Sequence, residues 1–206
     1  MFPLETALLP GEELPLRIFE PRYCALVRDC MGSDEPSFGV VLISAGREVG
    51  GGDVRCDVGA LARISQCHDF GDGRYALRCE MSDRIRILQW LDDGPYPRAA
   101  VELWPDRPGD VVAEARIRDV EDRIITLFER IAAARGARLR GRDVVLGADP
   151  PDNPGKRLYA LASRVPMGQA DRYSVLSAPT VAARLDALSE AVDTVAAMVE
   201  FQLSDD

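Results

Sequence analysis

From residue 71 to residue 91 the chain reads GDGRYALRCEMSDRIRILQWL. The opening Gly-Asp-Gly is typical of the tight connection between two antiparallel strands. From Tyr75 to Met81 apolar and polar residues alternate, so the apolar side chains share one face of a strand. The alternation resumes from Arg84 to Leu91. This stretch therefore predicts a hairpin whose second strand is long and buried on one face.

Similar short runs surround the hairpin and extend a β-rich region over residues 1–108. We expect further strands within residues 2–9, 14–19, 38–43, 54–70 and 99–104. The segment 54–70 is long for one strand, so we expect two pieces or a bend, with Gly59 at the kink. Pro21 opens a short helix that ends near Met31. Consecutive short strands with one inserted helix favour a small barrel.

The pattern becomes helical after residue 109. Apolar residues recur at spacings of three and four over residues 117–131 and again over residues 181–199, which predicts two long amphipathic helices. We expect shorter helices at 158–165 and 171–176, after a polar linker at 141–154. The chain is thus expected to be α+β, with a β domain at 1–108 and a helical domain at 109–206.

The last helix carries an apolar seam from Val181 to Val199. Such a seam can pack on the helix that begins near residue 110, or it can join two chains as a homodimer. We favour packing within the chain, because apolar stripes on helices most often face a core.

The composition narrows the classes of partner. The chain has 34 acidic and 25 basic residues and a net charge of −9, which opposes broad binding to a phosphate backbone, so we expect no nucleic-acid partner. There is no apolar run of about 18 residues and no secretory signal at the start, so we expect no membrane span and a cytoplasmic location. Five cysteines, an odd number, favour reduced thiols over a disulfide framework.

No group of side chains suggests catalysis, so we expect a protein that is not an enzyme and that holds no cofactor or metal. The nearest match to a phosphate-binding loop, Gly155-Lys156-Arg157, lacks the upstream glycine and the following hydroxyl. The only histidine, His68, follows Cys67 on a predicted strand, so the two side chains point to opposite faces. By the same alternation, His68 shares a face with Ile64 and Phe70. The cysteine spacings match no zinc motif.

The first residues carry a specific pattern. Phe2-Pro3-Leu4 is followed by Leu9-Pro10-Gly11 and then by LPLRIFEPRY at residues 14–23. This pattern resembles the start of the Lon amino-terminal domain, also called the Lon substrate-binding domain. Supporting pieces follow in the expected order at residues 38–40, 59–64, 84–88 and 161–167.

The resemblance implies a PUA-like β pseudobarrel followed by a C-terminal helical bundle. It also implies a stand-alone bacterial member of the family, because the ATPase and Ser–Lys peptidase modules of the full protease cannot fit in the remaining residues. Such a module would recognise exposed apolar segments of unfolded or tagged proteins in protein quality control. A separate protease or chaperone would be a further partner.

Aromatic and arginine side chains near strand ends are our candidate contacts, because such residues are enriched in binding patches. They are Phe19, Arg22, Tyr23, Trp90 and Tyr96. The glycines Gly50, Gly51 and Gly52 predict a mobile loop that could close on a ligand.

Two alternatives remain open. A small molecule or regulatory ligand would need an enclosed pocket with convergent polar groups. RNA binding, which the charge disfavours, would need several arginines to form one exposed basic face. These arginines are Arg63, Arg74, Arg78, Arg84 and Arg86.

Overall fold

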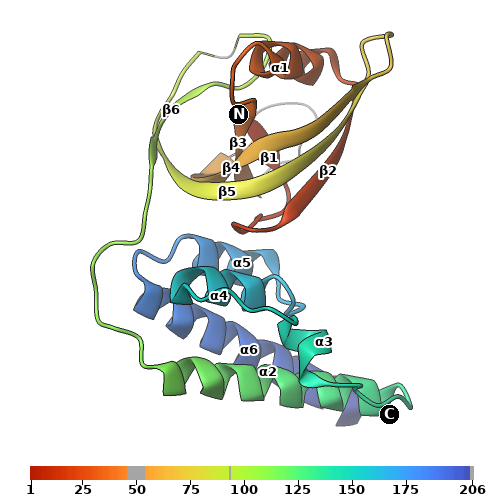
Figure 1. Cartoon of the computed structure of the whole chain (residues 1–206), viewed down its shortest axis with the longest axis vertical. Helices are drawn as coiled ribbons and strands as arrows, with labels where there is room; N and C mark the ends of the chain where they lie inside the picture. The colour runs from red at the N-terminus through yellow and green to blue at the C-terminus, as the bar shows by residue number, and fades with distance from the viewer. Residues whose placement is uncertain (46–53, 93, 205–206) are drawn as a thin grey trace. The chain divides into compact units, whose positions relative to one another are not determined.

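The computed structural model describes residues 1–45, 54–92 and 94–204 (Figure 1). The loop expected at Gly50, Gly51 and Gly52 lies outside these ranges. The chain forms two compact units, Met1–Pro105 and Asp106–Asp206, and each is described by itself. The first unit holds the strands and the second holds the long helices, which confirms the α+β class.

The first unit is a curled sheet with one inserted helix (Figure 1). The strands are β1 (Phe2–Leu4), β2 (Glu13–Ile18), β3 (Ser37–Ala45), β4 (Val54–Asp69), β5 (Tyr75–Trp90) and β6 (Ala99–Leu103). Helix α1 (Pro21–Met31) lies between β2 and β3 and begins at the expected proline. The strand order is β1-β3-β4-β5-β2, and β6 also pairs with β5. The β1–β3 pair is parallel and the other pairs are antiparallel.

The hairpin between β4 and β5 has the expected turn. Gly71 and Gly73 both have a φ of +79°, a left-handed conformation that favours glycine. The strand after it is continuous, and its predicted inward residues are all buried. They are Tyr75, Leu77, Cys79 and Met81. With Phe2, Ile18, Leu26 and Phe38 among others, they form the core of this unit.

Strand β4 is a single strand of 16 residues whose register shifts on both sides of Gly59. A further shift against β5, between Ile64 and Gln66, inserts Ser65 as one extra residue on β4. The Ser65 hydroxyl donates a hydrogen bond to the carbonyl oxygen of Arg78 at 2.9 Å. The bulge reverses the alternation: Ile64 packs on the core, whereas His68 is exposed. The prediction that His68 shares a face with Ile64 is therefore wrong.

The second unit is a bundle of five helices within the described residues. They are α2 (Glu114–Ala134), α3 (Arg142–Leu146), α4 (Pro154–Ala162), α5 (Gln169–Leu176) and α6 (Val181–Ser204). Residues Leu185, Leu188, Val192 and Val195 of the α6 seam are buried, and α6 packs against α2, α4 and α5. The seam therefore serves the core of the bundle, as we favoured. The segment expected as a linker contains α3, which buries Val145.

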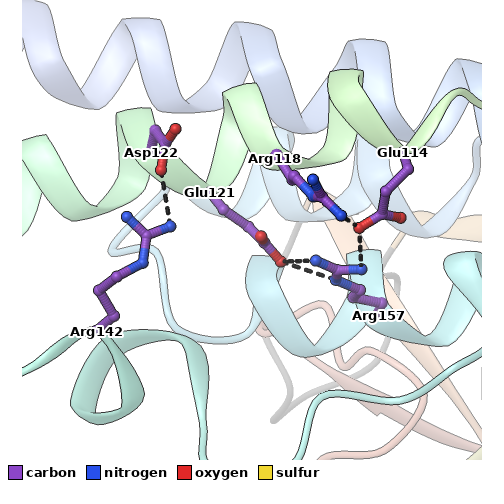
Figure 2. A network of polar contacts seen from close by, with 6 residues as sticks. All are labelled: Glu114, Arg118, Glu121, Asp122, Arg142 and Arg157. Carbon is purple, nitrogen blue, oxygen red and sulfur yellow. Dashed lines mark hydrogen bonds and ion pairs between the residues drawn. The ribbon is translucent and has the colours of Figure 1, made fainter.

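Arginine side chains tie these helices together. Arg184 on α6 is 1% exposed, pairs with Asp106, and donates a hydrogen bond to the Gly155 carbonyl oxygen at 3.3 Å. Its guanidinium lies 3.9 Å from the centre of the Tyr159 ring. Figure 2 shows that Arg157 on α4 forms ion pairs with Glu114 and Glu121 of α2. No helix in the described part of the chain is both long and apolar enough to cross a bilayer.

Candidate functional site

The described residues contain no cluster of three or more side chains that could hold a metal ion. All five cysteines, each of which the structure describes, are free thiols. Burial raises the pKa of the Cys79 thiol to about 12, and burial also raises the pKa of Cys30 and Cys67. These thiols are therefore protonated near neutral pH and are poor nucleophiles. The candidate binding site lies on the surface of the first unit.

The outward face of β2, β5 and β4 forms this surface. On β2, Leu14 and Ile18 point into the core, so the residues that alternate with them point outward. Arg17 lies opposite Ala76 of β5, which lies opposite His68 of β4. These three form the middle row of a surface that we call the aromatic groove.

The row nearest the hairpin supplies aromatic rings. Phe19 follows β2 and is 70% exposed, and Phe70 follows β4 and is 55% exposed. The ring of Phe70 meets the ring of His68 edge to face, with 4.6 Å between centroids. Both phenyl rings line one hollow of about 500 Å³, whose floor includes Ala76. Two rings this exposed at one place are typical of an interaction surface.

The third row continues the groove along the strands. Pro15 lies opposite Arg78, which lies opposite Gln66. A second hollow of about 560 Å³ covers this row and shares Arg17 and Ala76 with the first. The two hollows therefore form one groove, open to solvent, that follows the direction of the strands.

Arg74 at the aromatic end is already neutralised. Its Nε donates to the Asp72 carboxylate at 2.7 Å, and its terminal nitrogen lies 2.5 Å from the same oxygen. The hydrogen bond from Arg74 lowers the pKa of Asp72. Arg74 therefore lines the same hollow as the two phenyl rings with its charge balanced by Asp72.

Of the five contacts expected from the sequence, only Phe19 lines the aromatic groove. Tyr23 is 5% exposed and its ring stacks on Phe2 at 4.1 Å, so it belongs to the core. Arg22 pairs with Glu20 at 3.0 Å and lies over the Tyr23 ring. The structure thus removes Tyr23 from the candidate contacts.

The two later aromatic candidates lie away from the groove. Trp90 is half-buried at the end of β5, with the Arg55 guanidinium 4.5 Å from its ring. The hydroxyl of Tyr96 donates to Asp29 at 2.5 Å, which joins the segment after β5 to α1. This hydrogen bond raises the pKa of Tyr96 to about 12.

The sequence analysis did not select Arg17, His68, Phe70 or Ala76 as contacts, and it named Arg78 only for the RNA alternative. Alternation in β2 and β5 does place Arg17, Ala76 and Arg78 outward, so that signal was present. In contrast, no pattern in the sequence indicates the bulge at Ser65, which places His68 and Phe70 on the outward face.

Neither alternative use of the barrel gains support. Arg84 is 5% exposed, with its guanidinium 4.4 Å from the Trp104 ring, so the five arginines required for RNA binding do not form one exposed face. The aromatic groove is open rather than enclosed, which fits an extended chain better than a compact ligand. A third hollow, between α2 and α6, is lined by charges that already pair, such as Arg116 with Asp186.

Comparison with known proteins places this geometry in a family. Residues 1–194 match the family described as the ATP-dependent protease La (LON) substrate-binding domain. The Lon protease of Anaeromyxobacter dehalogenans is 29% identical over 142 residues, and the Lon protease of Koribacter versatilis is 24% identical over 196 residues. These matches cover 65% and 90% of this chain but only 17% and 22% of those proteases. The chain thus spans about a fifth of their length.

Two solved structures share the fold. The Lon N-terminal domain protein from Xanthomonas campestris is 27% identical with a TM-score of 0.60, covering 91% of this chain and 94% of that one. The N-terminal domain of the Mycobacterium avium complex Lon protease, 15% identical, also has a TM-score of 0.60, covering 92% and 94%. These likenesses confirm the expected pseudobarrel followed by a helical bundle.

Proposed function

Because the chain belongs to the LON substrate-binding domain family, we propose that it binds exposed apolar segments of unfolded or tagged proteins in quality control. The observation that carries this proposal is the pair of exposed phenyl rings, Phe19 and Phe70, at one end of a continuous open groove. The module binds its client and carries out no reaction, in keeping with the family's description as a substrate-binding domain.

The size of the aromatic groove sets the expected affinity. Burying one apolar side chain of a client contributes about 1.5–3 kcal/mol, and association itself costs several kcal/mol. One or two client side chains between Phe19 and Phe70 therefore give only weak binding, and further contacts along the groove must supply the rest of any micromolar affinity. Weak and short-lived contact suits a module that examines many unfolded chains and passes them on to a separate protease or chaperone.

Fluorescence anisotropy with a labelled, permanently unfolded chain tests the proposal. The probe is reduced and alkylated α-lactalbumin. Phe19→Ser and Phe70→Ser should each weaken binding by about fivefold to tenfold, because each removes an apolar wall of the groove. Phe201→Ser is the matched control, since Phe201 is 69% exposed on α6 and lies outside the groove.

A second variant keeps both rings and fills the space between them. Ala76→Leu places a larger side chain on the floor of the groove and should weaken binding as much as the loss of a ring. The proposal fails if wild-type protein does not bind at tens of micromolar, or if the Phe201 variant loses as much affinity as the groove variants.

Three finer expectations stay predictions. The cytoplasmic location was expected from the lack of a long apolar run and of a secretory signal in the sequence, and the collaborating protease or chaperone from the family resemblance. A homodimer through α6 would have to use surface other than the buried seam residues, such as Leu188. Size-exclusion chromatography with light scattering measures the oligomeric state directly.

A further inference from the structure

We propose that the aromatic groove selects segments in which an apolar side chain and a carboxylate lie two residues apart along an extended chain. The apolar side chain lies between Phe19 and Phe70, and the carboxylate lies beside Arg17. This inference rests on the proposed function and adds a sequence preference to it.

The charge that recognises the carboxylate is uncompensated. Among the residues that the structure describes, neither Arg17 nor Arg78 has a carboxylate within ion-pair distance. Both side chains are exposed and line the groove. In a chain of net charge −9, two unpaired guanidinium groups on one sheet face form a local site of opposite sign.

The nearest acidic side chains of the hairpin do not cancel this charge. Asp72 is held by Arg74. Asp69 accepts a hydrogen bond from the Gly71 amide at 2.8 Å, and its charge reaches the inward-facing Cys67, whose pKa is raised first by burial and then by Asp69. Because Asp69 is two residues from the inward-facing Cys67 on β4, alternation turns it away from the face that carries His68.

Charge also varies along the groove. Beyond the row that contains Arg78, Glu13 of β2 lies directly opposite Glu80 of β5, and Glu80 lies opposite Arg63 of β4. Arg63 also lies 3.9 Å from Glu35, so the glutamates outweigh it at this far end, and a client carboxylate is favoured beside Arg17 over positions past Arg78. The groove therefore has an apolar end, a basic middle and an acidic limit.

Strand geometry fixes the spacing of the motif. Phe19 and Arg17 are alternate residues at the end of β2, so their side chains lie about 7 Å apart along the groove. An extended client that lies along β2 has the same repeat. Its apolar residue and its carboxylate must then be two positions apart, since the residue between them points away.

A polypeptide fits this surface better than a single-stranded nucleic acid. A nucleic acid would stack bases on the phenyl rings, but it also needs a basic path for successive phosphates. Here the basic path is two arginines long and ends at Glu13 and Glu80.

The test compares three labelled peptides of about ten residues in a Ser/Thr background. Each has one Phe, and the residues two positions before and two positions after it are both Asp, both Asn or both Lys. At low salt the Asp peptide should bind about twofold to fivefold more tightly than the Asn peptide, the range expected for an exposed ion pair, and the Lys peptide more weakly. Salt at about 0.5 M should remove the difference by screening.

Variants locate the preference. Arg17→Gln should make the Asp and Asn peptides bind equally, because the guanidinium that distinguishes them is lost. Arg140→Gln is the matched control, since Arg140 is exposed in the helical unit and lies outside the groove. Moving each Asp to the position directly beside the Phe should also remove the gain.

The outcomes separate this inference from the proposed function. If all three peptides bind equally, or if Arg140→Gln has the effect of Arg17→Gln, the acidic preference is wrong and the apolar recognition stands. If no peptide and no unfolded chain binds, the proposed function itself is wrong. Tighter binding of a single-stranded oligouridylate than of the Asp peptide would overturn the assignment to a polypeptide.

Discussion

At Gly59 the backbone of β4 passes so close to β3 that a Cβ atom would lie 2.1 Å from the carbonyl oxygen of Val40. A backbone atom cannot move aside as a side chain can. We expect Gly59→Ala to lower the free energy of unfolding by about 3 kcal/mol, measured by urea denaturation. Gly94→Ala is the control, because its Cβ would meet nothing closer than Arg98 Nε at 3.7 Å. Equal stability of the two variants would contradict this account.

Tyr96 gives a prediction about alkaline pH. The hydrogen bond to Asp29 raises its pKa to about 12 in the folded protein, whereas an unfolded tyrosine titrates near pH 10, about its ordinary value. A group whose folded pKa is raised stabilises the fold below its unfolded pKa, and this stabilisation is lost as the pH rises through the folded value. The wild-type protein should therefore lose stability between about pH 10 and pH 12.

The Tyr96→Phe variant isolates this effect. It should be about 1 kcal/mol less stable than wild type at pH 8, the usual contribution of one hydrogen bond, and its stability should fall less steeply above pH 10. Urea denaturation at a series of pH values measures both quantities. Parallel pH profiles for the two proteins would show that Tyr96 does not titrate as proposed.

At the scale of the element, the strands β2, β4 and β5 were all predicted, but the face on which the residues of β4 lie after Ser65 was not. Strict alternation in β5 correctly placed Tyr75 inward and Ala76 outward, because each strand faces the core on one side. On β4 the extra residue at Ser65 reverses the alternation, and no residue type marks that position. The partners of Phe19 in the groove could not be assigned for this reason, since His68 and Phe70 reach the outward face only through the bulge.

Helix α6 depends on one buried cation. Arg184→Met should lower the free energy of unfolding of the helical unit by about 2 kcal/mol, because the pair with Asp106 and the bond to the Gly155 carbonyl are both lost. Arg130→Met is the control, since Arg130 pairs with Glu200 at an exposed site and should cost less than about 1 kcal/mol. Thermal unfolding followed by circular dichroism ranks the two variants, and a larger loss for Arg130→Met would refute the role of Arg184.

At the scale of the whole molecule, the place where the chain divides can be tested with fragments. From the sequence we predicted a domain boundary after residue 108, whereas the first compact unit of the structure ends at Pro105. Two of the three residues between these positions make contacts inside the helical unit. Asp106 pairs with Arg184, and the Arg107 amide donates to the carbonyl oxygen of Pro179 at 2.9 Å.

We therefore expect fragment 106–206 to unfold cooperatively and fragment 109–206 to be less stable by about 3 kcal/mol, because the shorter fragment leaves the guanidinium of Arg184 buried without its carboxylate. Urea denaturation of the two fragments measures the difference. In fragment 109–206, Arg184→Met should restore stability, because it removes a buried charge that has lost its partner. In fragment 106–206, the same substitution should reduce stability, because it breaks the pair with Asp106. Equal stability of the unmodified fragments would place the boundary at residue 108 after all.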